Sequence, residues 1–355
     1  MPDKLKGGLY MRTITNLNKS WRFIKKNVGL PDKLPTDWGE VDLPHTWNAV
    51  DGHDGNGSYD RGCYWYAQTF QTPKQPLAGG RVFVDIPAAG QQATVYVNGK
   101  EICYHEGGYS TFRADITDAC VDNGENLLVI ACSNENKSSV YPQSADFTFY
   151  GGLYRGLNLI SVPETHFELM YWGSNGLKVT ATPTQCGGAE FALESWVVNA
   201  DENFTVLYSI CDADGKEVGY SVRPADNTAV KIFVPDVTLW DCDNPYLYTV
   251  TAVLQRRNEA YDTVSARVGV RSFSCDPDKG FILNGVPTPL RGVSRHQDQL
   301  YKGNALTREE HFQDAKIIKE LGANTIRLAH YQHSQDFYDA CDELGFIVWA
   351  EIPFI

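Results

Sequence analysis

The sequence predicts a multidomain, mostly β protein: a jelly-roll sandwich, then an immunoglobulin-like sandwich, then the first strands of a (β/α)8 barrel. Up to about residue 273, short apolar or alternating segments are separated by turn residues, which is typical of sandwiches. After residue 275, two helical patterns that each end in Leu-Gly alternate with apolar strands, which is the order of a parallel β/α array. The chain has 355 residues, 43% of them hydrophobic, and is long enough for two or three domains.

The first predicted domain, residues 1–163, consists of strands. Three segments have strand length and apolar or alternating character: RVFVDIP (81–87), ATVYVNGK (93–100) and NLLVIACSN (126–134). Asn98-Gly99 is the residue pair that a type I′ hairpin turn prefers. Trp65 and Tyr66 lie in a strand pattern, and we expect them in the core rather than stacked on a sugar. Short strands without helical periodicity favour a jelly roll.

The second predicted domain, residues 164–273, is another run of strands. Its segments are FALESWVVNA, FTVLYSICDADGKEV, TAVKIFVPD, YLYTVTAVLQ and DTVSARVGVRSF. Their spacing of roughly 8 to 12 residues, with Asp-Gly and Asn-Pro punctuation, predicts an immunoglobulin-like sandwich. Proline and polar residues near 163 and 274 predict domain junctions at those positions.

The third predicted domain, residues 274–355, begins a barrel. Thr307 to Glu310 form a capping box that opens a helix. The apolar positions predicted to face inward from the two helices are Phe312, Ala315, Ile318 and Leu321, then Phe337, Cys341 and Leu344. NTIRLAH and FIVWAEIP are strands, and Gly322 and Gly345 end the helices.

A complete barrel needs about 250 residues, and only 80 remain from Asp276 to Ile355. We therefore expect three barrel strands and a poorly packed end, with an uncovered apolar edge at Phe346 to Val348.

Composition excludes several classes of partner. The formal charge of −13 argues against nucleic acid and anionic membranes, because the field repels phosphate. No signal peptide or membrane-spanning stretch is visible, which predicts a cytoplasmic protein, or a periplasmic or secreted one if a leader was removed. Met11 is a second candidate start. Nine scattered cysteines without C-x-x-C predict reduced thiols and no zinc site.

Six stretches together resemble glycoside hydrolase family 2, in the family's order: RGCYWYAQTF, ATVYVNGKEICYHEGGYSTFRADIT, DFTFYGGLYRGLNL, LWDCDNPYLYTV, LRGVSRHQD and NTIRLAHYQHSQDFYDACDELGFIVWAE. The resemblance implies a retaining glycosidase with two catalytic glutamates, which in the family follow the fourth and seventh barrel strands. Neither region is in this sequence, so we expect the 355-residue chain to be inactive.

Within the family, LRGVSRHQD and RLAHY look most like β-galactosidases, so terminal β-galactosides are the expected substrates. Two alternatives stay open: a family 2 enzyme of other specificity, such as a β-glucuronidase, and a carbohydrate-binding or adhesion module without catalysis. The pair His296 and His330 at predicted barrel strand ends discriminates the enzyme from the binding module, since a binding module has no need of the start of a barrel.

The resemblance also assigns site residues. His296 and His330 lie at the C-terminal ends of predicted barrel strands, where barrel enzymes place their active-site groups, and are expected to bind the sugar. Asp146, in the DFTFYGG loop, is expected to reach the same site. Arg327 is expected to be buried and paired with Glu351 behind the sugar-binding residues; a place on the floor of the active site is the alternative role for Arg327. Glu351 comes one strand too early to be a catalytic carboxylate.

The remaining candidates receive no ligand role. Six histidines lack metal-site spacing: His45, His53, His105, His166, His311 and His333. No metal or other cofactor is assigned, although the family often carries magnesium or sodium. Gly151, Gly152 and Arg155 are expected at a backbone turn and a domain interface. The family resemblance also implies a carbohydrate substrate and an expected homo-oligomer.

Overall fold

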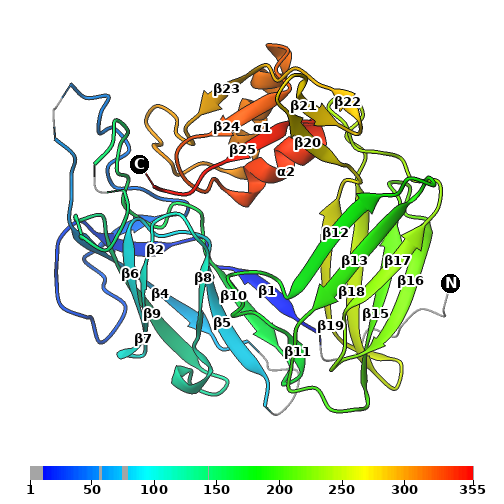
Figure 1. Ribbon diagram of the computed structural model, residues 1–355. Coiled ribbons are helices and arrows are strands. Elements are labelled where there is room, and N and C mark those ends of the chain that lie inside the picture. Colours follow the sequence, from blue (N-terminus) through cyan, green and yellow to red (C-terminus); the bar gives the residue numbers. More distant parts are fainter. Residues whose placement is uncertain (1–10, 56–57, 74–78, 143, 355) are drawn as a thin grey trace.

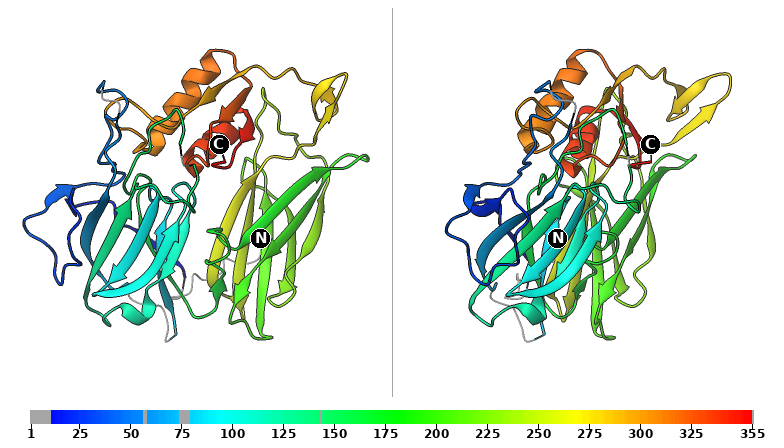
Figure 2. Two further views of the ribbon diagram at one scale, coloured as in Figure 1. Left: turned by 60° about the vertical axis from the view of Figure 1, so that its left-hand side comes forward. Right: turned by 90° about the vertical axis from the view of Figure 1, so that its left-hand side faces the viewer.

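The computed structural model describes residues 11–55, 58–73, 79–142 and 144–354. Two β-sandwiches stand next to each other, and a smaller α/β unit lies across the same end of both (Figure 1). A view turned by 60° shows the same arrangement (Figure 2). The N-terminal stretch before Met11, treated above as an extension, lies outside the described residues.

The first sandwich pairs a four-stranded sheet, in the order β1-β10-β5-β8, with a six-stranded sheet, in the order β3-β2-β4-β9-β6-β7. All neighbours in both sheets are antiparallel. The elements are β1 Thr13–Asn16, β2 Trp21–Ile24, β3 Gly39–Val41, β4 Cys63–Gln71, β5 Arg81–Ile86, β6 Gln92–Val97, β7 Lys100–Glu106, β8 Phe112–Asp115, the 3-10 helix Thr117–Ala119, β9 Glu125–Ser133 and β10 Asn158–Val162.

Aromatic side chains fill the core of this sandwich, as predicted. Tyr66 is fully buried in the main core with Trp21, and Trp65 packs at 7% exposure in a second cluster on the outer face of β4. The predicted hairpin is confirmed, because β6 pairs with β7 around Asn98 and Gly99, which both have positive φ.

The second sandwich packs the sheet β12-β13-β17 against the sheet β16-β15-β18-β19, with a two-stranded ladder β11-β14 beside them. Its core contains the buried residues Phe191, Tyr208 and Val250. The strands are β11 His166–Phe167, β12 Leu177–Pro183, β13 Ala189–Ser195, β14 Val197–Val198, β15 Phe204–Cys211, β16 Glu217–Pro224, β17 Val230–Val234, β18 Tyr248–Arg256 and β19 Glu259–Val268. Described strands of the two sandwiches form no common sheet, and the exact domain limits stay a prediction.

The third unit begins with a small antiparallel sheet, β20-β21-β22, and continues with the parallel sheet β23-β24-β25, whose strands are linked by α1 and α2. The elements are β20 Phe273–Asp276, β21 Gly280–Leu283, β22 Val286–Pro287, β23 Gly292–Arg295, α1 Arg308–Glu320, β24 Thr325–Leu328, α2 Gln335–Leu344 and β25 Ile347–Ala350. The described residues of this unit therefore contain three parallel strands and no closed barrel.

The helix ends follow the sequence signals. Thr307 and Glu310 form the predicted capping box of α1, so two free backbone N–H groups find partners. Gly345 ends α2 in the left-handed conformation, with φ of 76°. A Cβ at this position would lie 2.4 Å from the carbonyl oxygen of Cys242 in the second sandwich, so close packing also requires glycine.

Three expectations for the third unit are wrong in detail. Phe346 is 2% exposed because it packs in the core between the sheet and both helices, so the predicted uncovered edge does not include it and this side of the unit is well packed. The exposed aromatic residue of β25 is Trp349, at 65%. Leu321 is 72% exposed, because it is the C-cap of α1 and lies beyond the packed face.

Buried polar contacts fix the units relative to one another. Arg12, before β1, forms an ion pair at 2.7 Å with Asp262 of β19, whose side chain is fully buried. The indole N–H of Trp240 donates to the carbonyl oxygen of Asp342 in α2, at 2.9 Å. These contacts join the first sandwich to the second, and the second to the α/β unit.

No helix among the described residues is long and apolar enough to cross a membrane. All nine cysteines are free thiols.

Candidate active site

The three parallel strands place polar side chains at one edge of their sheet. His296 directly follows β23, His330 lies two residues after β24, and Glu351 directly follows β25. The parallel register aligns Arg295, Leu328 and Ala350, the last residues of the three strands. Residues just beyond these positions are therefore neighbours at the C-terminal edge of the sheet, where β/α barrels carry their active sites.

Arg327, Glu351 and His330 form a cluster at this edge. Arg327 Nε lies 2.6 Å from Glu351 Oε1, and Arg327 Nη2 lies 3.2 Å from His330 Nδ1. The same Nδ1 lies 3.1 Å from Glu351 Oε2. Because guanidinium only donates and carboxylate only accepts, this ring nitrogen can serve one of them at a time.

The expected pairing of Arg327 with Glu351 is present, but the expectation that Arg327 is buried is wrong. Its side chain is 43% exposed, whereas that of Glu351 is 18% exposed. Arg327 projects from the face of β24 that α1 and α2 do not cover, since alternate residues of a strand point to opposite faces and its neighbours Ile326 and Leu328 are fully buried in the helix-facing core. The guanidinium therefore lies at an open surface of the site.

A loop of the first sandwich completes the cluster. The ring of Phe147 lies 5.2 Å from that of His296 and 5.8 Å from that of His330, and it is 8% exposed. The two histidine rings are 5.3 Å apart. His296 Nδ1 is also 3.2 Å from the hydroxyl of Tyr331. The DFTFYGG loop thus reaches the strand ends, where Phe147 contacts both histidine rings.

Two carboxylates, Asp298 and Asp146, lie close enough to His296 to affect its pKa. Burial lowers the pKa of His296 below its usual value, against the opposing charges of Asp298 and Asp146. Asp146 is exposed beside Phe147, so its carboxylate is free to meet a ligand. Asp298 instead accepts a hydrogen bond from Tyr150 of the first sandwich, at 3.0 Å. Burial therefore favours the neutral imidazole of His296, whereas the two carboxylates favour its protonated form.

Gly152 forms a backbone bridge within the first sandwich, and Arg155 contacts the α/β unit. Gly152 has a φ of 120° and forms a bridge with Gly90. Arg155 donates to the carbonyl oxygens of Tyr109 and Gln332. Gln332 lies two residues after His330, so Arg155 ties the sandwich to the segment that carries this histidine.

Sequence reasoning missed several residues that shape the site. Phe147 and Tyr331 were adjacent to predicted residues but were given no role, and Arg295 and His333 form a buried group behind the histidines. The sequence signal for Arg295 was its position next to His296 at the end of a strand. Neighbouring residues of an extended segment point to opposite sides, so a site at His296 places Arg295 behind it. No sequence signal identified His333 as its partner.

The arrangement presents polar groups beside an aromatic ring. It offers hydrogen-bonding groups on His296, His330 and Asp146 next to an aromatic side chain, which is the mixture of polar and apolar contacts found in small-ligand sites. It offers no metal centre, because no group of three His, Cys, Asp or Glu side chains in the described part of the chain is placed to hold an ion.

Comparison with family models defines the class of protein. The "Glycosyl hydrolases family 2, sugar binding domain" matches residues 49–163, "Glycosyl hydrolases family 2" matches residues 177–271, and the "Glycosyl hydrolases family 2, TIM barrel domain" matches residues 277–355. The chain belongs to glycoside hydrolase family 2. The β/α unit therefore corresponds to the family's barrel domain, and the candidate site lies at its strand ends.

Curated relatives carry two activity names. The chain is 32% identical to a beta-glucuronidase of Bacteroides fragilis over 350 residues, which are 96% of this chain and 49% of that protein. It is 30% identical to a beta-galactosidase of Thermoanaerobacter pseudethanolicus over 354 residues, which are 96% of this chain and 47% of that protein. The chain thus spans about half the length of the curated relatives it matches.

Solved structures show the same pattern. A crystal structure described as an FMN-binding beta-glucuronidase from Faecalibacterium prausnitzii L2-6 is 62% identical, with a TM-score of 0.92 over 97% of this chain and 53% of that one. A putative beta-galactosidase from Bacteroides fragilis is 33% identical, with a TM-score of 0.89 over 96% of this chain and 53% of that one.

Proposed function

We propose that this chain is the part of a retaining β-glycosidase that binds the terminal sugar. The observation that carries the proposal is the convergence of His296, His330 and the Phe147 loop at the C-terminal ends of three parallel strands. Membership of glycoside hydrolase family 2 supports this function.

In this proposal His296 and His330 donate hydrogen bonds to sugar hydroxyls or accept them, and the carboxylate of Asp146 accepts them. Glu351 holds Arg327, and one of these two side chains orients His330 through its Nδ1. The acid and the nucleophile are two glutamates, about 5 to 5.5 Å apart in a retaining enzyme, supplied by residues outside this sequence. The 355-residue polypeptide alone is therefore proposed to be inactive.

The proposed substrate is a β-glucuronide in preference to a β-galactoside. This reverses the preference drawn from LRGVSRHQD and RLAHY, and it rests on relatives: the 62% identical structure is a beta-glucuronidase, whereas the beta-galactosidases reported above are 30% and 33% identical. The geometry is neutral between the two sugars, because Arg327, the cation of the described cluster, is already paired with Glu351.

The experiment compares two chromogenic substrates. The full gene product, purified from a host without β-glucuronidase or β-galactosidase activity, is incubated with p-nitrophenyl β-D-glucuronide and p-nitrophenyl β-D-galactoside. We expect turnover of the glucuronide with the larger kcat/KM. Faster turnover of the galactoside would show that the enzyme is a β-galactosidase instead. Turnover of neither substrate would reject the proposed function.

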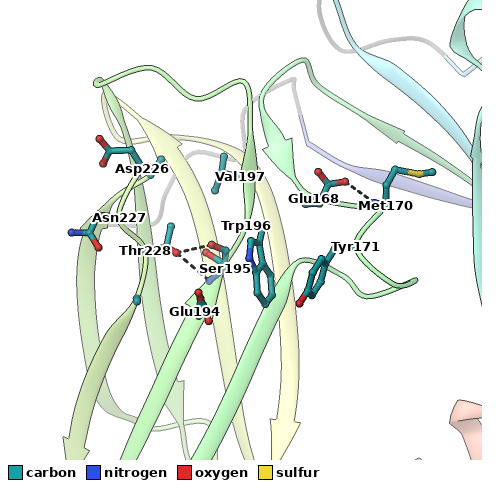
Figure 3. Close-up of a pocket in the computed structure, with 12 residues that line it drawn as sticks. Glu168, Met170, Tyr171, Glu194, Ser195, Trp196, Val197, Asp226, Asn227 and Thr228 are labelled. Atoms are coloured by element: carbon teal, nitrogen blue, oxygen red, sulfur yellow. Dashed lines mark hydrogen bonds between the residues drawn. The ribbon is translucent and has the colours of Figure 1, made fainter.

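Glycan binding without catalysis is the second candidate, and one observation favours it. A groove of about 670 Å³ lies on the second sandwich, where Tyr171 and Trp196 stack with ring centroids 4.5 Å apart (Figure 3). None of the site residues named above lines it. A binding module would lose glycan affinity on Trp196→Ala and would be unaffected by His330→Ala, whereas the glycosidase proposal expects the reverse for turnover.

A carbohydrate is the proposed partner. Self-association and a cytoplasmic location remain predictions from the sequence.

A further inference from the structure

Arg295 is a buried cation directly behind the candidate site. Its side chain is 6% exposed at the end of β23, and its Nε lies 3.1 Å from Asp314 Oδ2 of α1. The guanidinium carbon lies 3.8 Å from the centre of the Phe337 ring in α2. A buried charge is costly unless it is paired, so this position is defined by specific partners from both helices.

The residues on either side of His296 hold the segment that follows His330. Arg295 Nη1 lies 3.2 Å from His333 Nδ1, and the Gln297 side-chain oxygen accepts from the backbone N–H of Ser334 at 3.0 Å. Both Arg295 and Gln297 are buried, with 6% and 1% exposure. The flanking side chains therefore anchor this segment while His296 itself lies against Phe147 and Tyr331.

Hydrogen-bond chemistry fixes the protonation state of His333. Arginine has no acceptor, so His333 Nδ1 must accept from Arg295. The proton of the neutral ring is then on Nε2, which lies 3.1 Å from the carbonyl oxygen of Ala329 and donates to it. Burial, assisted by the charge of Arg295, lowers the pKa of His333 well below its usual value, which agrees with a neutral ring.

A second histidine completes the arrangement around Arg295. His311 Nδ1, on α1, lies 3.2 Å from Arg295 Nη2 and therefore also accepts. The cluster thus combines one cation, the carboxylate of Asp314 and two neutral imidazoles. Ala329, the end of the chain of hydrogen bonds through His333, is the residue immediately before His330.

We infer that Arg295 is a positioning residue that acts through neutral His333 to hold the backbone at Ala329, and so fixes His330 relative to His296. The inference rests on the proposed glycosidase function for its effect on activity. Its structural part, the relay from Arg295 to Ala329, does not. A displacement of about 1 Å at a reacting centre can cost roughly 100-fold in rate, so loosening this backbone is expected to reduce kcat.

The activity test uses a matched series in the full gene product. His333→Leu removes both hydrogen bonds, His333→Gln retains an acceptor and a donor, and Arg295→Lys retains charge without the planar fork. We expect His333→Leu to lower kcat by about 10- to 100-fold with a smaller change in KM, and His333→Gln to restore most of the loss. Equal kcat for the Leu and Gln variants, both folded, would overturn the inference.

The control is Arg308→Gln. Arg308 also pairs with carboxylates, Asp336 at 2.9 Å and Asp339 at 3.0 Å, and lies 4.5 Å from the ring of Phe312, but its side chain is 45% exposed. It contacts neither His333 nor His330 among the described interactions. Its kcat should stay within about twofold of the parent.

A spectroscopic readout separates this inference from the proposed function. In the parent chain with 15N-labelled histidine, the His333 signals should report a neutral ring with the proton on Nε2 at pH 6.5, and Arg295→Lys should change them. A His333 ring that protonates near pH 6.5, or carries its proton on Nδ1, would overturn the relay even if the enzyme is active. An intact relay in a protein without glycosidase activity would reject the proposed function alone.

Discussion

Arg327 of β24 and Glu351, which directly follows the neighbouring parallel strand β25, are joined by two hydrogen bonds: Nε to Oε1 at 2.6 Å and Nη2 to Oε2 at 3.4 Å. The pair lies at the surface of the candidate site, with 43% and 18% of the side chains exposed. Partly exposed ion pairs contribute about 1 kcal/mol or less to folding. A role in orienting His330 therefore separates experimentally from a role in stability.

We expect Glu351→Gln in the full gene product to lower kcat/KM by about tenfold or more, because it removes the charge that orients Arg327 and His330. The free energy of unfolding should fall by less than about 1 kcal/mol. Kinetics on the preferred aryl glycoside and urea denaturation measure the two quantities. A loss of stability that accounts for the whole loss of activity would show that the pair is structural.

His296→Ala and His330→Ala are each expected to lower kcat/KM by roughly 10- to 100-fold, since hydrogen bonds to a charged or polarised group contribute about 1.5 to 3 kcal/mol. Most of the loss should appear in kcat if these bonds strengthen in the transition state. His53→Ala, at an exposed histidine of the first sandwich, is the control and should keep parental activity. Parental activity in both site variants would exclude their assigned roles.

The buried ion pair between the sandwiches should matter far more for folding. Asp262 accepts from Arg12 and from the backbone N–H of Phe167, and its side chain is fully buried. We expect Arg12→Ala to destabilise the chain by about 3 to 5 kcal/mol, because it leaves a buried carboxylate without its cation. Lys19→Ala, whose partner Asp42 is half exposed, should cost less than about 1 kcal/mol. Similar midpoints of denaturation for the two variants would contradict this.

Stability should depend on pH through His45. Burial lowers its pKa to about 4 in the folded chain, where its Nδ1 lies 2.8 Å from the hydroxyl of Tyr66. The unfolded chain takes up the proton at about pH 6.5, so stability is lost as the pH falls from 6.5 towards 4. Between pH 7 and pH 5 the titration of His45 lowers the free energy of unfolding by roughly 2 kcal/mol.

The His45→Gln variant provides the measurement, because glutamine can accept the Tyr66 hydrogen bond without titrating. Urea denaturation of the 355-residue chain at pH 7 and at pH 5 should show that the parent loses roughly 2 kcal/mol more than the variant. The same loss in both proteins would mean that His45 is protonated in the folded state at an ordinary pKa.

Local patterns in the sequence were sufficient where neighbouring residues decide the structure. Asn98-Gly99 specified a hairpin, and Thr307 with Glu310 specified a helix start, because both signals act through the nearest backbone groups. The positions of His296 and His330 at strand ends followed from the predicted order of strands and helices, which is also read from neighbouring stretches of sequence.

The remaining features depend on contacts between distant segments. Phe147 approaches the two histidines across about 150 and 180 residues of sequence, and no periodicity reports such a meeting. The exposure of Arg327 was mispredicted because an arginine within an apolar strand looks buried until the uncovered face of the sheet is known. The partners of Arg295 likewise come from two helices and a loop.

The central claim, that these strand ends bind the sugar of a β-glycosidase, is tested most directly by turnover of p-nitrophenyl β-D-glucuronide. Three proteins are compared in one assay: the full gene product, its His330→Ala variant and the 355-residue chain. We predict hydrolysis by the first, a loss of roughly 10- to 100-fold in kcat/KM for the second, and none by the third, which lacks the two proposed glutamates. Hydrolysis by the 355-residue chain, or unchanged turnover by His330→Ala, would contradict the account.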